Sequence, residues 1–135
     1  MQPKPVPTIA TPVTRTPTLS DESADPRVTI VTEERELGPV GTKVVFENDQ
    51  VRVWVLKLAP GERSAVHRHD LDHLLIQIRG DRIAVEPEPD AAGPHRDYME
   101  ADVIPGMVAH VPKGGIETAV NIGAEPYYEV IVELK

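Results

Sequence analysis

The sequence has 135 residues, a length that suits one domain with a core of its own. Hydrophobic residues make up 40% of the chain but aromatic residues only 4%, so the core has to be built mainly from Val, Ile and Leu. The formal net charge of −8 argues against a nucleic acid or an anionic membrane as a partner, because both attract basic surfaces. The absence of cysteine excludes disulfides and thiolate metal sites.

The first 26 residues differ in composition from the rest, because they hold six of the fourteen prolines. Proline lacks an N–H group and fixes φ, so this segment is not expected to form a helix or an interior strand. Two interpretations remain open: a disordered tail, or an extended arm that lies over a neighbouring subunit. The predicted organisation is therefore a tail or arm over residues 1–26 and a folded domain over residues 27–135.

The folded part shows many short strand signals separated by turn residues, and no stretch has a clean helical period beyond a turn or two. The strongest signal places Val51, Val53 and Val55 on one face of a strand. This pattern predicts an all-β sandwich or barrel. We expect strands at residues 28–32, 43–46, 51–58, 74–78, 82–86, 97–103, 108–112, 116–121 and 127–134, and an exposed loop at 87–94.

Three of the five histidines, His67, His69 and His73, fall within seven residues and have the same parity. Side chains of equal parity point to one face of an extended strand. Such a strand would aim three imidazoles into one space, and imidazoles are ligands that transition metals prefer. Glycines at positions 61 and 80 bound this stretch. The pattern therefore predicts a metal site rather than a surface histidine pair.

A second stretch has a matching set of spaced residues: Gly106, Pro112, Gly114, Glu117 and Asn121. At these spacings the chain resembles the cupins over roughly residues 43 to 135. The usual cupin motifs read Gly, five residues, His-x-His, three or four residues, Glu, six residues, Gly, and then Gly, five residues, Pro-x-Gly, two residues, His, three residues, Asn.

The chain departs from these motifs at two complementary positions. His73 stands where the first motif has Glu, and Glu117 stands where the second has His. Three histidines and one glutamate are retained with two positions exchanged, which favours a preserved site. The resemblance implies the metal ligands His67, His69, His73 and Glu117 and a divalent transition ion: Fe, Mn, Ni, Cu or Zn.

The resemblance also implies a jelly-roll β-barrel of two packed antiparallel sheets that encloses a cavity for a small molecule, in a chain that forms a homodimer. We expect the cavity to be lined by residues with suitable parity or polarity: Gln77, Tyr98, His110 and Trp54. His95, in the polar loop, is expected to be exposed. Asp70 and Asp72 are expected to face outward or to support the ligands.

The predicted function is that of a metal-dependent enzyme of the dioxygenase or oxidoreductase type, although no residue is assigned as catalytic. Two alternatives remain: a non-catalytic sensor or ligand-binding cupin, and a pseudo-enzyme in which the His/Glu exchange has abolished metal binding. No apolar run reaches the ~20 residues of a membrane span. Prolines also interrupt the N-terminus where a secretory signal has its apolar core, so the chain is expected to be cytoplasmic.

Overall fold

The computed structural model describes residues 35–135, which form nine strands and no helix. The predicted tail or arm at 1–26 and the expected strand at 28–32 lie outside the described residues. In chain order the strands are β1 (Lys43–Glu47), β2 (Val51–Leu58), β3 (His67–Arg68), β4 (His73–Arg79), β5 (Arg82–Pro87), β6 (Met99–Asp102), β7 (Val108–Val111), β8 (Ile116–Asn121) and β9 (Tyr127–Leu134). The described part of the chain has no helix of the length and apolarity that a membrane crossing requires.

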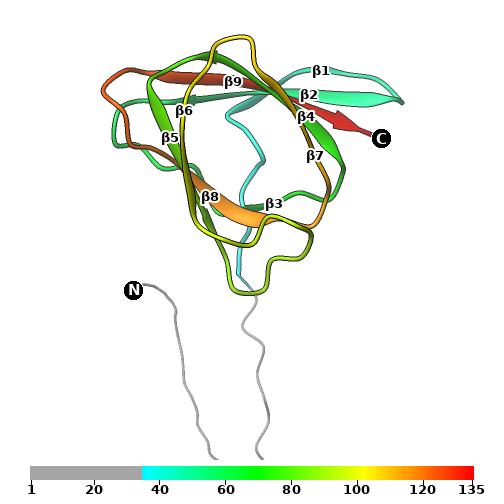
Figure 1. Cartoon of the computed structure of the whole chain (residues 1–135). Helices are drawn as coiled ribbons and strands as arrows, with labels where there is room; N and C mark the ends of the chain where they lie inside the picture. The colour runs from blue at the N-terminus through cyan, green and yellow to red at the C-terminus, as the bar shows by residue number, and fades with distance from the viewer. Residues whose placement is uncertain (1–34) are drawn as a thin grey trace, which may run out of the picture. The chain divides into compact units, whose positions relative to one another are not determined.

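The strands form two antiparallel sheets that face each other (Figure 1). One sheet has the order β1-β2-β9-β4-β7 and the other the order β3-β8-β5-β6. Consecutive strands often lie in different sheets or are not neighbours, as in a jelly roll. The predicted all-β jelly roll is therefore confirmed. The strand expected at 97–103 is shorter than predicted, since β6 begins only at Met99.

Side chains from both sheets meet in the core between them. Leu56, Leu58, Tyr127 and Ile131 come from the five-stranded sheet, and Ile83 comes from the other. Burying an aliphatic or aromatic side chain of this size contributes about 1.5–3 kcal/mol. The core therefore holds the two sheets together with almost no aromatic residues, as the composition predicted.

The central strand β9 has a burial pattern that its sequence does not suggest. Its buried face carries Tyr127, Glu129, Ile131 and Glu133, while the aliphatic residues between them are only half-buried on the outer face. Pairing with β2 on one side and β4 on the other fixes this orientation over eight residues. Two carboxylates therefore lie inside the barrel.

The four glycines of the two motifs all have positive φ angles. Gly80, between β4 and β5, shows the reason most clearly. Its φ is +143°, and a Cβ atom placed there would lie 2.8 Å from Cδ1 of Tyr127. Only glycine adopts this conformation without strain and allows the turn to pack on the core. The glycine spacing of the motifs thus reflects the positions at which the chain turns.

Asn121, at the end of β8, connects three parts of the barrel. Its side chain is completely buried, with Nδ2 donating to the carbonyl oxygens of Leu58 (3.0 Å) and Glu125 (2.8 Å). Its Oδ1 accepts a hydrogen bond from the backbone N–H of Gly123 at 3.0 Å. The last residue of the second motif is therefore a structural residue.

We expect Asn121→Ala to lower the free energy of unfolding by about 2–4 kcal/mol, because it removes three hydrogen bonds of a completely buried side chain to the backbone. Chemical denaturation measures this. Asn48→Ala is the control, since Asn48 also bonds backbone groups but is exposed, and should cost about 1 kcal/mol or less. Equal losses in the two variants would contradict the structural role of Asn121.

Candidate metal centre

The pairing of β3 with β8 places His67 directly opposite Glu117. Residues opposite each other in an antiparallel pair have neighbouring side chains on the same face. His69 lies just beyond β3, and its backbone N–H and C=O bond to Gly115 and Gly114, both at 2.8 Å. The backbone therefore holds two imidazoles and one carboxylate side by side.

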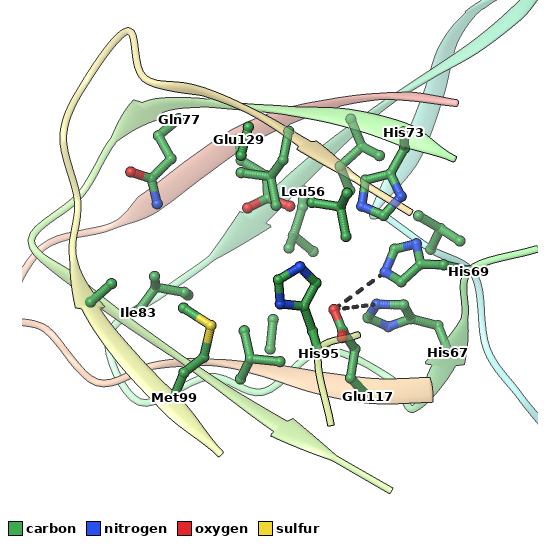
Figure 2. Close-up of a pocket in the computed structure, with 18 of the residues that line it drawn as sticks. Leu56, His67, His69, His73, Gln77, Ile83, His95, Met99, Glu117 and Glu129 are labelled. Atoms are coloured by element: carbon green, nitrogen blue, oxygen red, sulfur yellow. Dashed lines mark hydrogen bonds and ion pairs between the residues drawn. The ribbon is translucent and has the colours of Figure 1, made fainter. Parts of the chain in front are cut away.

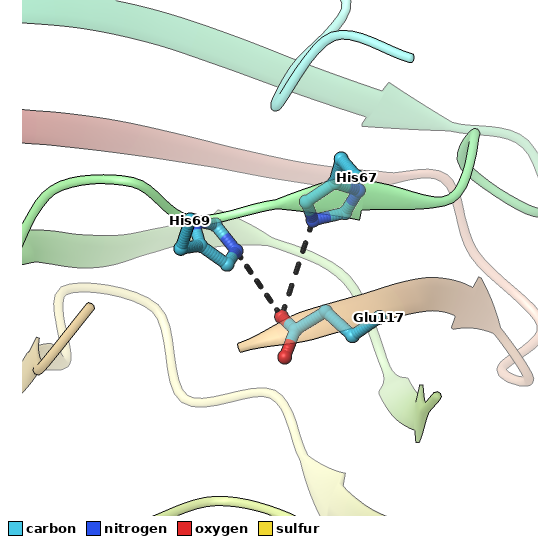
Figure 3. A group of neighbouring side chains, drawn as sticks. All are labelled: His67, His69 and Glu117. Atoms are coloured by element: carbon cyan, nitrogen blue, oxygen red, sulfur yellow. Dashed lines mark hydrogen bonds and ion pairs between the residues drawn. The ribbon is translucent and has the colours of Figure 1, made fainter. Parts of the chain in front are cut away.

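The three side chains converge from opposite strands (Figure 3). One potential ligand atom from each lies within 4.8 Å of the others. Nε2 of His69 is 3.3 Å from Oε2 of Glu117, and Nε2 of His67 is 4.0 Å from the same oxygen. Both histidines are buried, and the Glu117 side chain is 20% exposed. This spacing allows one ion to bind all three.

Hydrogen bonding orients the two imidazoles differently. Nδ1 of His67 lies 2.8 Å from the carbonyl oxygen of Ala65, so it carries the proton and leaves the Nε2 lone pair free toward Glu117. Nδ1 of His69 is buried and has no hydrogen-bond partner within the described residues. A buried polar atom without a partner is uncommon in a folded protein and often marks a place where an ion or water belongs.

The protonation states also suit a cation. Burial lowers the pKa of His67, only partly opposed by its bond to Ala65, so the imidazole is neutral at physiological pH. Burial acts to raise the pKa of Glu117, but the hydrogen bond with His69 and the nearby histidines outweigh it and lower the pKa. The neutral imidazole of His67 and the ionised carboxylate of Glu117 are the forms that bind metal.

His73 lies beside this cluster rather than within it. It is 1% exposed, and its ring stacks on that of His69 with 4.1 Å between centroids. Burial lowers its pKa to about 4, so it too is neutral. Its nitrogens are not among the converging ligand atoms, because His73 belongs to β4 of the opposite sheet. The structure thus brings three of the four predicted ligands together and places the fourth against them.

Nitrogen donors with one carboxylate form a donor set that binds Fe, Mn, Ni, Cu or Zn, and they disfavour Ca²⁺ and Mg²⁺. The cluster of His67, His69 and Glu117 therefore fits a divalent transition ion. Three protein ligands leave coordination positions open on such an ion, as catalytic sites require.

The cluster forms part of the wall of a cavity of about 270 Å³ between the two sheets. Figure 2 shows the three imidazoles and Glu117 on one side, with Gln77, Ile83 and Met99 away from them. Most of the wall is apolar, with side chains such as Leu56, Leu75, Ile83, Val85, Met107 and Ile131. The volume suits a small organic molecule, since drug-sized sites begin at roughly 300 Å³.

The four predicted cavity residues lie in different places. Gln77 is buried in the wall. His110 borders the cavity, but its pairing with Leu74 gives it the parity opposite to His73 and Gln77, so its side chain belongs to the outer face. Tyr98 and Trp54 are not part of the wall.

Each of these two aromatic residues has another partner. Tyr98 precedes β6, is 53% exposed, and donates a hydrogen bond to Glu100. Trp54 packs against the core, and its Nε1 donates to Glu133 at 2.7 Å. The prediction that Tyr98 and Trp54 line the cavity is therefore corrected. The sequence indicated aromatic residues near the core but not the direction in which their side chains point.

Among the wall residues that were not predicted, His95 and Glu129 carry titratable side chains. His95 is exposed, as expected from its polar loop, yet it also borders the cavity, and Figure 2 shows its ring directed inward. Glu129 was missed because acids in a strand are usually assigned to the solvent face. No sequence signal indicated its position, because alternation in β9 assigns the more apolar half of the strand to the core.

Glu129 is buried among apolar side chains, and the hydroxyl of Tyr127 donates a hydrogen bond to its Oε1. Burial, reinforced by the charge of Glu117, raises the pKa of Glu129 to about 7, although the bond from Tyr127 opposes the shift. Burial also raises the pKa of Tyr127, so its phenol stays protonated and acts as the donor. Glu129 thus changes charge near physiological pH.

This shift predicts a pH-dependent stability. The folded-state pKa of about 7 exceeds the ordinary value of 4.5, so folding favours the protonated acid, and stability falls as pH rises from 4.5 to about 7. The loss amounts to about 3 kcal/mol. In metal-free protein, Glu129→Gln should remove this contribution, so its stability relative to wild type should rise across that interval. Parallel pH profiles from denaturant melts would contradict the assignment.

Comparisons with known proteins agree with this architecture. No protein-family model matches the chain. Auxin-binding protein T85 of Nicotiana tabacum is 25% identical over 94 residues, which are 69% of this chain and 50% of that protein. The chain spans about half the length of the curated relatives it matches.

Two solved structures show the same fold. A cupin domain from Bordetella pertussis matches with a TM-score of 0.59 and 20% identity, covering 76% of this chain and 99% of that one. A double-stranded β-helix protein from Klebsiella pneumoniae matches with a TM-score of 0.53 and 25% identity, covering 67% and 72%. With this topology, and with both motif-bearing strands placed at the cavity, the chain has the jelly-roll fold of cupin domains.

Proposed function

We propose that the chain binds one divalent transition-metal ion and acts as a metal-dependent enzyme of the dioxygenase type on a small organic molecule in the cavity. The observation that carries this proposal is the position of His67, His69 and Glu117 on the wall of a largely apolar cavity. The proposal includes His73 as a fourth ligand, because its ring stacks on that of His69 with 4.1 Å between centroids.

The residues of the site have separate tasks. His67 and His69 supply nitrogen donors, and Glu117 supplies the negative charge that offsets the ion. The apolar wall excludes bulk water and holds the substrate next to the cluster, which strengthens electrostatic interactions there. When bound, a transition ion would supply Lewis acidity and, where it is redox-active, a site at which O₂ can react.

A second function is favoured by one specific observation. The curated relatives are named auxin-binding proteins, and a ligand-binding role needs the cavity but no turnover. Binding without catalysis is therefore the alternative proposal.

We expect His67→Ala to lose most of its bound metal while the barrel persists, because the core packing does not involve the cluster. Metal affinity should fall by more than the ~10–100-fold typical for loss of a residue that only supports a ligand. Elemental analysis of untagged protein and circular dichroism measure the two effects. The control is His110→Ala, on the outer face, which should keep its metal. Full metal content in His67→Ala would refute the ligand assignment.

Oxygen uptake distinguishes the two functions. The protein loaded in turn with Fe, Mn, Ni or Cu is supplied with small diketones and phenols, and O₂ consumption is followed with an electrode. The enzyme proposal predicts uptake with at least one metal and substrate, abolished in His67→Ala. Saturable binding of these compounds without uptake by any of the four loaded proteins would favour the binding role instead.

A further inference from the structure

Apart from the cluster of His67, His69 and Glu117, the cavity wall carries a further buried carboxylate. Glu129 lines the wall formed by β9, opposite Gln77 of β4. An ionised carboxylate can accept about four hydrogen bonds. Within the described residues, Glu129 accepts one, from the Tyr127 hydroxyl to Oε1. A buried carboxylate with so few partners is costly to the fold.

The neighbouring acid on the same face of β9 shows the contrast. Glu133 is equally buried, but it accepts hydrogen bonds from Trp54 Nε1 at 2.7 Å and from Arg52 Nη1 at 3.3 Å. Glu133 is not part of the cavity wall. Glu133, which faces other protein groups, therefore has its hydrogen-bond partners, whereas Glu129, which faces the cavity, can accept further hydrogen bonds.

The hydrogen bonds that reach Glu129 all run in one direction. The backbone N–H of Ile104 donates to Oε1 of Gln77 at 2.9 Å, which turns the Gln77 amide nitrogen toward the Tyr127 hydroxyl, 3.4 Å away. That hydroxyl donates its only proton to Glu129. The chain of donors ends at Glu129, so the ionised form of this acid offers the cavity an acceptor.

The position of Glu129 allows one small molecule to reach both polar regions. Glu133 pairs with His73, and Glu129 lies four residues away along β9, about 13 Å between backbone positions. The side chains of Glu129 and His73 both point into the cavity, so the gap that a ligand has to span is shorter than this backbone distance. The side chains between them, such as Leu56 and Ile131, offer no hydrogen bond.

We propose that Glu129 is a specificity residue that accepts a hydrogen bond from a hydroxyl or amino group of the bound molecule. The ligand class is then a small, mostly apolar molecule with an oxygen donor for the metal at one end and an O–H or N–H group at the other. This inference rests on the proposed function for the metal-binding end only. Gln77 and Tyr127 are positioning residues, since they act through Glu129.

The test compares two molecules of nearly equal shape, 4-hydroxybenzoate and 4-methylbenzoate. Calorimetry is carried out on the zinc-loaded protein, because zinc is redox-inert and prevents turnover. The pH is held well above 7, so that Glu129 is ionised. Wild type should bind the hydroxyl compound about 10-fold more tightly or better, as expected for a hydrogen bond to a charged acceptor. Glu129→Leu should reduce the ratio to near one, and Glu129→Gln should lower it, because a neutral acceptor is weaker.

Glu133→Gln is the matched control and should keep the wild-type ratio, since this acid lies outside the cavity wall. A ratio near one in wild type, or an unchanged ratio in both Glu129 variants, would overturn the proposal. Circular dichroism shows whether each variant is folded. If one Glu129 variant is misfolded, the affinity ratio of the other Glu129 variant tests the proposal. Repeating the titration after chelation tests the metal separately: equal affinity with and without zinc would count against the proposed metal-dependent function and leave the hydroxyl preference standing.

Discussion

The antiparallel register between β3 and β8 is the constraint on which the site depends. It sets His67 opposite Glu117, and the bonds of His69 to Gly114 and Gly115 extend the pairing by the residues needed to bring in a second imidazole. A shift of one residue would turn one partner out of the barrel, because side chains alternate between faces. The motif spacing thus sets the strand register, and the strand register sets the geometry of the potential ligands.

The interior of the barrel is mostly apolar, so the few polar groups inside it depend on one another or on a ligand for hydrogen bonds. In such surroundings each buried donor or acceptor needs a partner, and most have one: Asn121 bonds three backbone groups, and Glu133 bonds Trp54 and Arg52. Two exceptions border the cavity, Nδ1 of His69 and the spare capacity of Glu129. The unmet hydrogen-bonding capacity therefore belongs to two residues of the cavity wall.

Sequence patterns predicted the strands and the metal cluster well, because both depend on local spacing. Equal parity of His67 and His69 and the glycine positions were enough to place the two imidazoles together. The position of His73 was harder to predict, since it joins the opposite sheet after a turn and stacks on His69 instead of converging with it. Glu129 was beyond reach, because the more apolar half of β9 faces outward and alternation alone assigns its acids to solvent.

The most direct test of this account is a crystal structure of the metal-loaded protein, with diffraction recorded at the absorption edge of the ion. We expect one strong anomalous peak between His67, His69 and Glu117, with ligand atoms at about 2.0–2.2 Å from the ion. A nitrogen of His73 at the same distance would complete the four-ligand set. A fully loaded protein whose anomalous peak lies away from these residues, or a protein that binds no ion, would contradict the assignment of a metal centre.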